Sequence, residues 1–368
     1  MRVLLLVGHS TGGIGAHVAS LAGGLGAHDV EVVVGTSAAT AERFDLHAED
    51  VWPAGSPGTR LRRLARLRTL AAGCTVVHAH GHQAGLLAVA VAATVPRRRG
   101  RGPVVVVSWH NAVLGSGPAR RARGLLEAVQ ARRADLVTGA SSDLVERAAS
   151  LGARSPELAP VAAPTAGTWT GDPEQVRRDL EASDGVPARA ALVLTVSRIA
   201  PQKNLDVLVD AAAAVGRDDL AWVVAGDGDG ALLARLRSRV AATSAPVTFL
   251  GARRDVGALM AASDVFALTS TWEARALVVQ EAMAAGTPVV ATDSGGLPEL
   301  VAGAGLLVPV GDAGALADAV RGLLGDAVER ARLAEAGRVR FGQLPDESDV
   351  IAAWAATYAR LRRERGRG

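Results

Sequence analysis

Two pairs of charged residues in the second half of the chain have the types and the spacing to hold a diphosphate. Arg198 and Lys203 lie in the loop SRIAPQKN, before the helical pattern NLDVLVDAAAAV, and cations at a helix entrance attract phosphate oxygens. Glu273 and Glu281 are eight residues apart, about 12 Å if the segment is helical, which is enough to bracket a diphosphate. Because carboxylates accept hydrogen bonds from hydroxyl groups, we expect one of them on each ring that flanks the diphosphate.

Lys203 is the only lysine among the 40 lysine and arginine residues of the chain. A compact ammonium can approach a bridging phosphate oxygen where a planar guanidinium would not fit. The alternative is that Arg198 and Lys203 are ordinary surface charges, and the retention of a single lysine argues against it. We therefore predict that both cations bind the diphosphate.

A glycine-rich loop follows the first apolar run, in GHSTGGIGAH at residues 8–17. Gly13 and its neighbours would let the backbone come close to a ligand, and they would open a helix whose N–H groups face an anion. A glycine turn at this place can also serve packing alone. The spacing does not fit GxGxxG, and no acidic residue ends the second apolar run, so a dinucleotide cofactor is disfavoured.

Histidines gather at the ends of two predicted strands in the first half. His110 ends the run VVVVSWH, where a side chain is either a catalytic group or an ordinary polar contact. His78, His80 and His82 alternate in VVHAHGH, a spacing that can bind a metal, but no nearby carboxylate or cysteine completes a ligand set. We interpret these three as buried or loop histidines and predict no metal site.

Short apolar runs alternate with helical patterns through both halves, as is typical of βαβ units in parallel sheets. The runs are VLLLV, VEVVVG, TVVHAH, VVVVSWH and DLVTGAS in the first half, and ALVLTVSR, LAWVVAGDG, VTFLG, DVFALTS and TPVVATD in the second. The segment SPELAPVAAPTAGTWTGDPEQ separates them as a linker. The sequence therefore predicts an α/β protein of two Rossmann-like domains, residues 1–165 and 176–349. Their parallel sheets would face each other across a cleft, with ligands at the carboxyl ends of the strands.

Composition indicates a globular protein in a reducing compartment. Of the 368 residues, 49% are hydrophobic and 21% are charged, and the single cysteine, Cys74, cannot form a disulfide within the chain. The longest apolar run, AGLLAVAVAATVP, has 13 residues, too few to span a bilayer. The N-terminal MRVLLLVGHSTGG lacks the pattern of a secretory signal. We predict a cytoplasmic location.

Positive charge is concentrated in the first half of the chain. Residues 1–165 contain 18 arginines and 11 acidic residues, and basic residues cluster in TRLRRLARLR, PRRRGRG and ARRAR. Two interpretations of the first cluster stay open: a solvated helix packed by its leucines, or attraction to an anionic membrane surface or a phosphate-bearing acceptor. The second would place the protein peripherally at the inner membrane face. Nucleic acid is disfavoured as a partner, because aromatic residues make up only 3% of the chain.

Over nearly its whole length the chain resembles the retaining family-four glycosyltransferases of the GT-B fold. The family motif typically reads EGFGLVVLEAMAAGTPVVA, and this chain has EARALVVQEAMAAGTPVVA. The loop SRIAPQKN is similar to the family's diphosphate loop, and GDG, FLGARRDV and DSGGLPELV follow in the family's order. The chain departs from the family in EARA, and in LAPVAAPTAG, which stands where the family has PNG.

The resemblance implies a retaining transferase that needs neither metal nor cofactor. It would move a sugar from a UDP-, GDP- or ADP-sugar to a hydroxyl acceptor that the sequence does not identify. The basic clusters leave a lipid-linked or phosphate-bearing acceptor open. Arg198 and Lys203 would neutralise the departing diphosphate, and Gly13 would close against it. Glu273 and His110 would contact the sugar, and Glu281 would bind the ribose of the nucleotide.

The last helical pattern, at about 350–365, carries Trp354, Tyr358 and Leu361 at helical spacing. The resemblance implies that this helix crosses back onto the first domain, whereas a helix packed on its own domain is the alternative.

Two other functions stay open. A non-hydrolysing nucleotide-sugar epimerase shares the fold but needs no acceptor. A sugar-nucleotide-binding protein without catalysis is compatible with the altered EARA segment.

Overall fold

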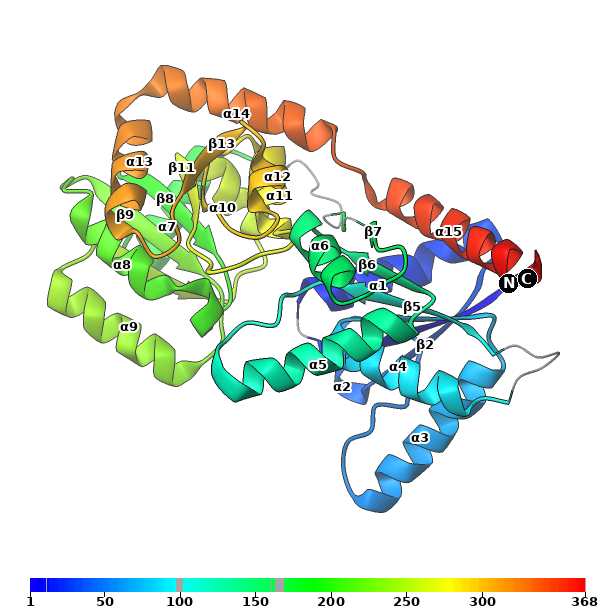
Figure 1. The fold of residues 1–368 in the computed structure, drawn as a ribbon. Coiled ribbons are helices and arrows are strands. Elements are labelled where there is room, and N and C mark those ends of the chain that lie inside the picture. Colours follow the sequence, from blue (N-terminus) through cyan, green and yellow to red (C-terminus); the bar gives the residue numbers. More distant parts are fainter. Residues whose placement is uncertain (11, 97–101, 160, 163–168, 368) are drawn as a thin grey trace. The chain divides into compact units, whose positions relative to one another are not determined.

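The chain divides into two compact units, which are labelled by element in Figure 1. The computed structural model describes residues 1–10, 12–96, 102–159, 161–162 and 169–367. Unit 1 is formed by Met1–Pro164 with Pro345–Gly368, and unit 2 by Thr165–Leu344. Parts of three predicted segments lie outside the described residues, namely residue 11 of the glycine-rich loop, 97–101 of PRRRGRG, and 160 and 163–168 of the linker.

Unit 1 is built on a seven-stranded parallel sheet in the order β3-β2-β1-β4-β5-β6-β7. The strands are β1 (Arg2–Val7), β2 (Glu31–Thr36), β3 (Ala48–Asp50), β4 (Val76–His80), β5 (Val104–Trp109), β6 (Leu136–Gly139) and β7 (Glu157–Leu158). The helices are α1 (Gly13–Gly24), η1 (Leu25–His28, a 3₁₀ turn), α2 (Ala38–Arg43), α3 (Pro57–Ala72), α4 (His82–Thr94), α5 (Gly117–Arg133), α6 (Ser142–Ser150) and α15 (Glu347–Arg367). All residues of β4 and β5 are buried, as expected for central strands of a parallel sheet covered on both faces.

Unit 2 is built on a six-stranded parallel sheet in the order β10-β9-β8-β11-β12-β13. The strands are β8 (Ala191–Val196), β9 (Leu220–Ala225), β10 (Val247–Gly251), β11 (Val265–Leu268), β12 (Val289–Thr292) and β13 (Gly305–Val308). The helices are α7 (Pro173–Asp184), η2 (Pro201–Lys203, a 3₁₀ turn), α8 (Leu205–Ala214), α9 (Gly230–Thr243), α10 (Val256–Ala262), α11 (Leu277–Ala285), α12 (Leu297–Val301), α13 (Ala313–Gly325) and α14 (Ala327–Gly342).

The core of unit 2 has one apolar layer on each face of its sheet. Val193 of β8 packs in one buried cluster, while its neighbours Leu192 and Leu194 pack in another. Alternate residues of a strand point to opposite faces, so the two clusters belong to the two layers of helices. This arrangement leaves the ends of the strands, where the loops gather, as the place for polar side chains.

The predicted fold class, two Rossmann-like domains with parallel sheets, is confirmed. Each of the ten predicted apolar runs overlaps a strand of the structure. The structure adds three short strands that the sequence did not predict, β3, β7 and β13. They lie at edges of the two sheets.

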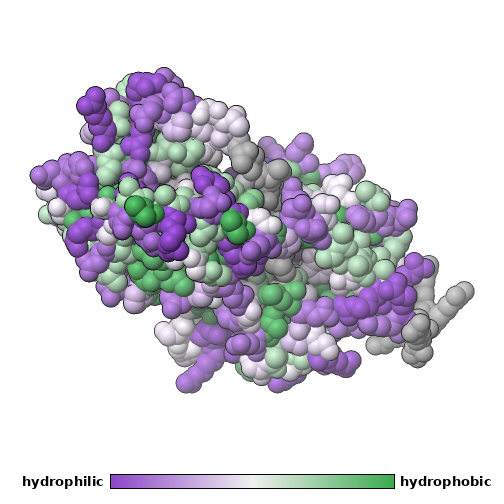
Figure 2. All heavy atoms as spheres, turned by 90° about the horizontal axis from the view of Figure 1, so that it is seen from above, coloured by the Kyte–Doolittle hydropathy of each residue, from purple (hydrophilic) through white to green (hydrophobic). Residues whose placement is uncertain are grey.

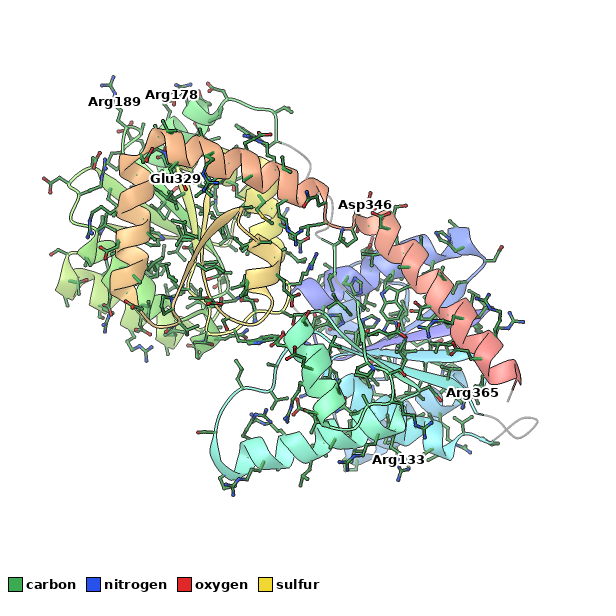
Figure 3. The ribbon with its side chains drawn as sticks, turned by 45° about the horizontal axis from the view of Figure 1, so that its top comes forward. Arg133, Arg178, Arg189, Glu329, Asp346 and Arg365 are labelled. Atoms are coloured by element: carbon green, nitrogen blue, oxygen red, sulfur yellow. The ribbon has the colours of Figure 1, made fainter. Side chains whose placement is uncertain are left out.

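Helix α15 packs on unit 1. Trp354, Tyr358 and Leu361 are buried in the core cluster that also contains residues of β1 and β4. Arg360 donates to both carboxylate oxygens of Glu157 at 2.8 Å, and Arg365, labelled in Figure 3, lies 3.5 Å from the carboxylate of Asp135. The chain therefore leaves unit 2 after α14 and ends on unit 1.

The surface gives two further observations. Figure 2 shows hydrophilic side chains spread over the visible face, with hydrophobic residues in small separate groups, as is usual for exposed protein surface. Within the described part of the chain, none of the helices has both the length and the apolar character needed to cross a bilayer.

Candidate active site

The charged residues predicted in unit 2 lie where its strand order reverses. Strand β8 lies between β9 and β11, so the chain builds one side of the sheet first and then returns to the other. In open α/β sheets, ligands bind outside the strand ends at such a switch point. The loop after β8 carries Arg198 and Lys203, and the loop after β11 carries Glu273. The fold thus makes neighbours of two loops that are far apart in sequence.

Hydrogen bonds join these two loops directly. The side chain of Gln202 donates from Nε2 to the carbonyl of Trp272 at 2.7 Å, and the amide of Thr271 donates to the carbonyl of Gln202 at 2.8 Å. The hydroxyl of Thr269 donates to the carbonyl of Lys203 at 2.7 Å. The main chain of the lysine loop is therefore fixed on that of the glutamate loop.

Lys203 and Glu273 form an ion pair, with Nζ 2.5 Å from Oε1. Each side chain is 14% exposed, so the pair is largely removed from water but is not sealed from it. Charges attract more strongly where water is partly excluded, and the ammonium has three donors, of which this contact uses one. Two residues that were predicted for the diphosphate and for the sugar are thus in direct contact, with a donor left for a further acceptor.

The loop after β12 supports the backbone of Glu273. The amide of Gly296 donates to the carbonyl of Glu273 at 2.8 Å, and the hydroxyl of Ser294 donates to the carbonyl of Thr271 at 2.7 Å. Gly295 has a φ of +60°, and a Cβ there would lie 2.1 Å from the Glu273 carbonyl oxygen. Only glycine fits such a position, so the DSGG stretch serves to hold Glu273 in place.

Arg198 and Glu281 have different surroundings from the ion pair. Arg198 is exposed, and its guanidinium makes no hydrogen bond or ion pair with the described residues. Glu281 is half-buried in α11, and burial raises the pKa of its carboxyl group. A partly desolvated carboxylate is stabilised by hydrogen-bond donors from a ligand, which makes Glu281 a candidate for binding hydroxyl groups.

The EARA segment adopts a backbone that alanine tolerates. Ala274 and Ala276 are buried, and neither is among the described residues with positive φ. Arg275 is half-buried, and its Nε has no hydrogen-bond partner within the described part of the chain. Burial, together with repulsion from Arg340, lowers the pKa of Arg275. The replacement of the family's glycines thus causes no left-handed strain, and the half-buried cation is the main chemical change.

In unit 1, Gly13 begins helix α1 and is exposed. The helix has no side-chain cap at Gly12 and no acidic residue in its first turn, so its N-terminal end can attract an anion. Gly15 has a packing role instead, because a Cβ there would lie 2.1 Å from the ring of Phe44. The contact of Gly13 with a diphosphate stays a prediction.

His110 follows β5, at the carboxyl end where it was predicted, and its ring is buried. Its Nε2 lies 3.1 Å from Nδ1 of His80, and burial lowers the pKa of His110 to about 3, so the ring is neutral near pH 7. His78 and His80 are buried, as the sequence analysis interpreted them. His17 of α1, which that analysis did not single out, joins the group, with its ring centroid 5.6 Å from that of His110.

Two family models match the chain. The model described as "Glycosyl transferase 4-like domain" matches residues 12–164, and the model described as "Glycosyl transferases group 1" matches residues 176–340. The two matches follow the two sheets of the structure, and together they span most of the chain.

Curated relatives match over part of their length. The chain is 38% identical over 161 residues to a phosphatidyl-myo-inositol mannosyltransferase of Mycobacterium leprae, and the aligned region covers 42% of this chain and 42% of the relative. It is 34% identical over 200 residues to a D-inositol 3-phosphate glycosyltransferase of Corynebacterium glutamicum, and the aligned region covers 51% of this chain and 45% of the relative. The chain therefore spans about half the length of the curated relatives it matches.

The fold is similar to that of several solved structures. Anabaena Alr3699/HepE, in complex with UDP, superposes with a TM-score of 0.83 at 24% identity, covering 98% of this chain and 100% of that chain. WaaG, a glycosyltransferase involved in lipopolysaccharide biosynthesis, gives a TM-score of 0.73 at 18% identity and covers 97% of this chain and 99% of that chain. With both domain models matched in order and the two parallel sheets in place, the chain belongs to the family-four glycosyltransferases of the GT-B type.

Proposed function

We propose that the protein is a glycosyltransferase that moves a sugar from a nucleotide-diphosphate sugar to a hydroxyl group of an acceptor, with retention at the anomeric carbon. The observation that carries this proposal is the Lys203–Glu273 ion pair at the switch point of unit 2. Backbone contacts from the loops after β8, β11 and β12 fix it there. Fixed charges at a strand-end site are what a reaction with a charged leaving group requires.

The donor would be held by the unit 2 residues described above. Arg198 and Lys203 bind the diphosphate, with Lys203 keeping its contact to Glu273 and giving another N–H to a phosphate oxygen. Glu273 accepts from hydroxyls of the donor sugar, and Glu281 accepts from the ribose. His110 and Gly13 of unit 1 keep the roles predicted for them near the anomeric carbon and the diphosphate.

The reaction would need no group beyond the donor and the acceptor. The bond between the anomeric carbon and the diphosphate oxygen breaks, and that oxygen keeps the electron pair. The acceptor oxygen forms the new bond to the anomeric carbon from the same face, and its proton passes to the departing phosphate. The protein contributes positioning and stabilisation of the negative charge that develops on the diphosphate.

The relatives suggest the classes of donor and acceptor. The names of two curated relatives include inositol phosphate or phosphatidylinositol, and a structural neighbour was solved with UDP-glucose. We therefore propose a phosphate-bearing or lipid-linked hydroxyl acceptor, and we place UDP-sugars first among the donors to test, followed by GDP- and ADP-sugars.

A donor panel tests this function and separates it from its alternatives. Thermal shift with UDP-, GDP- and ADP-sugars identifies the donor, since a ligand at 100 times its Kd adds about 2.7 kcal/mol to the free energy of unfolding. Release of nucleoside diphosphate is then measured with and without inositol-type acceptors. Acceptor-dependent release supports a transferase, isomerisation of the donor sugar without acceptor indicates an epimerase, and binding without turnover indicates a binding protein.

Transfer is expected to survive chelation. The proposed diphosphate site contains the cations Arg198 and Lys203, which can neutralise the leaving group without a metal ion. Activity in excess EDTA should therefore stay within about twofold of the activity of the untreated enzyme. Removal of a catalytic metal would have a far larger effect, because it takes away several kcal/mol of transition-state stabilisation. Loss of activity in EDTA with rescue by Mg²⁺ or Mn²⁺ would contradict the metal-independent mechanism.

The basic surface of unit 1 is compatible with a peripheral membrane contact, but through a different helix from the one that the sequence suggested. In α3, Leu67 and Leu70 are buried and Arg66 pairs with Glu49 at 2.6 Å, so two of its leucines pack within the unit and Leu61 alone is left as an exposed large apolar side chain. Helix α5 instead exposes apolar residues along one stretch. These residues are Leu125 at 71%, Leu126 at 46% and Val129 at 44% exposure.

We propose that α5 lies on an anionic membrane at the cytoplasmic face. Arg121 and Arg132 are exposed at either end of this apolar stretch. Positions four residues apart lie on one side of a helix, so Arg121, Leu125 and Val129 are neighbours. Apolar side chains flanked by arginines match the boundary between acyl chains and anionic headgroups.

Replacing Leu125 and Leu126 by glutamine is expected to weaken binding to vesicles that contain anionic lipid by about tenfold, or roughly 1.4 kcal/mol, because part of the leucine transfer energy is lost. Co-sedimentation measures the partition coefficient. Leu61→Gln in α3 is the matched control, since it removes a leucine that is 70% exposed without touching α5. Equal binding of neutral and anionic vesicles, or no difference between the variants, would refute this membrane contact.

A further inference from the structure

The strand order of unit 1 also reverses, and three histidines gather at that point. Strand β1 lies between β2 and β4, with β5 next to β4. His17 is in α1, which follows β1, His80 ends β4, and His110 directly follows β5. The ends of the neighbouring strands β4 and β5 and the helix that follows β1 therefore each contribute one buried imidazole to one place.

The three rings are close enough to share one ion. One nitrogen from each histidine can be chosen so that all three lie within 4.8 Å of one another. Around a tetrahedral ion with metal–nitrogen bonds of about 2.0–2.1 Å, ligand nitrogens lie about 3.3 Å apart. The chosen nitrogens are at most 4.8 Å apart, so each separation has to shorten by at most about 1.5 Å to reach this spacing.

A buried nitrogen of His80 has no partner, and this is an independent sign of a missing ligand. Nε2 of His80 is inaccessible to water and makes no hydrogen bond to any described residue. His78, two residues earlier on the same strand, is different: its Nδ1 lies 2.6 Å from the hydroxyl of Tyr358, and its Nε2 lies 2.7 Å from Oγ of Ser108. His78 is a satisfied core histidine, whereas His80 retains capacity for a ligand.

The chemistry of the donor set selects the kind of ion. We propose that His17, His80 and His110 form a site for a borderline divalent transition-metal ion, with Zn²⁺ as the first example. Imidazole suits Zn²⁺, Co²⁺, Ni²⁺ and Cu²⁺, whereas Mg²⁺ and Ca²⁺ prefer oxygen ligands, and no carboxylate belongs to this set.

Three histidines leave the fourth position of a tetrahedral ion to a water, as in zinc sites of the open kind. A cavity of about 10 Å³, about the space that a single water needs, lies against His17.

The site is tested by metal binding to the intact chain, which does not depend on transfer activity. Titration with Zn²⁺, and with Co²⁺ followed by its visible absorption, is expected to give one ion per chain and the intense bands of a four-coordinate ion. His17→Gln is expected to bind at least about 100-fold more weakly, because it removes one of three ligands. His47→Gln, which changes an exposed histidine, is the matched control and should bind like the unaltered chain.

The unaltered chain alone can overturn the proposal, whether or not His17→Gln folds. The proposal is wrong if the unaltered chain does not bind one ion, or if bound Co²⁺ shows the weak absorption of a six-coordinate ion. It is also wrong if a folded His17→Gln chain binds with full affinity. A consequence that rests on the proposed function is that bound Zn²⁺ would occupy His110 and inhibit transfer, with EDTA restoring it. Binding without inhibition would count against the role of His110 in transfer and leave the metal site standing.

Discussion

Glu273→Ala is expected to lower kcat by about 100-fold, with little increase in KM for the donor, whereas Glu281→Ala is expected to raise KM by about tenfold with kcat nearly unchanged. The sugar gains positive charge in the transition state, so contacts from a carboxylate to its hydroxyls strengthen there. The ribose is the same in the ground state and in the transition state, and a contact to it contributes equally to both.

Steady-state kinetics with the donor identified by thermal shift measures this difference. The ion pair also bears on the KM of Glu273→Ala, because the ammonium of Lys203 loses the acceptor that lies 2.5 Å away. That ammonium is then more available to the diphosphate, which should keep KM from rising. Glu281→Gln is the conservative control for size. A large KM effect at Glu273 together with a kcat effect at Glu281 would reverse the assignment and refute it.

The sheets could be predicted because their central strands are continuous apolar runs. The run ALVLTVSR has the composition that burial on both faces requires, and it contains β8 in the middle of its sheet. The three missed strands are at sheet edges and are short: β3 is AED, β7 is EL and β13 is GLLV. An edge strand has one neighbour and needs little apolar sequence, so its signal is weak.

The candidate site could be predicted as a set of loops but not as a set of contacts. The residue types of Lys203 and Glu273 suggested binding to a diphosphate and to a sugar, and each was considered alone. Their ion pair depends on β11 lying beside β8, which is a property of strand order and of long-range packing. His17 was missed for the same reason. It lies in the apolar helix after the glycine loop, and only the placement of β1 beside β4 brings it to His80.

The EARA segment shows what a family motif can and cannot indicate. The family motif has glycine where this chain has Ala274 and Ala276, yet the structure gives Ala276 a φ of −69°, which any residue can adopt. What the motif could not indicate is the environment of Arg275, which depends on Arg340 of α14 and on Glu299 of α12. The consequence of the substitution is therefore electrostatic rather than conformational.

Removal of either cation from the diphosphate loop is expected to have the largest effect in the protein. Arg198→Ala and Lys203→Ala should each lower kcat/KM by about 10²–10³-fold, the range found when one preorganised donor to a developing anion is lost. Lys203→Arg keeps the charge but replaces a point donor by a wider planar group, and it should lose at least about tenfold, or roughly 1.4 kcal/mol. The melting temperature of Lys203→Arg without ligand should be unchanged.

A double-mutant cycle decides whether Lys203 acts on the diphosphate alone or together with Glu273. If the two side chains act as a unit, the double alanine variant should be hardly worse than Lys203→Ala, because each single change already breaks their contact. Independent roles would instead make the two losses multiply, to about 10⁴-fold or more. The chain has arginine at every other cationic position, so full activity of Lys203→Arg would mean that the single lysine has no role in catalysis. Loss of activity in Lys203→Arg, with strong coupling to Glu273, would show that the site requires an ammonium able to hold a carboxylate and a phosphate oxygen at once.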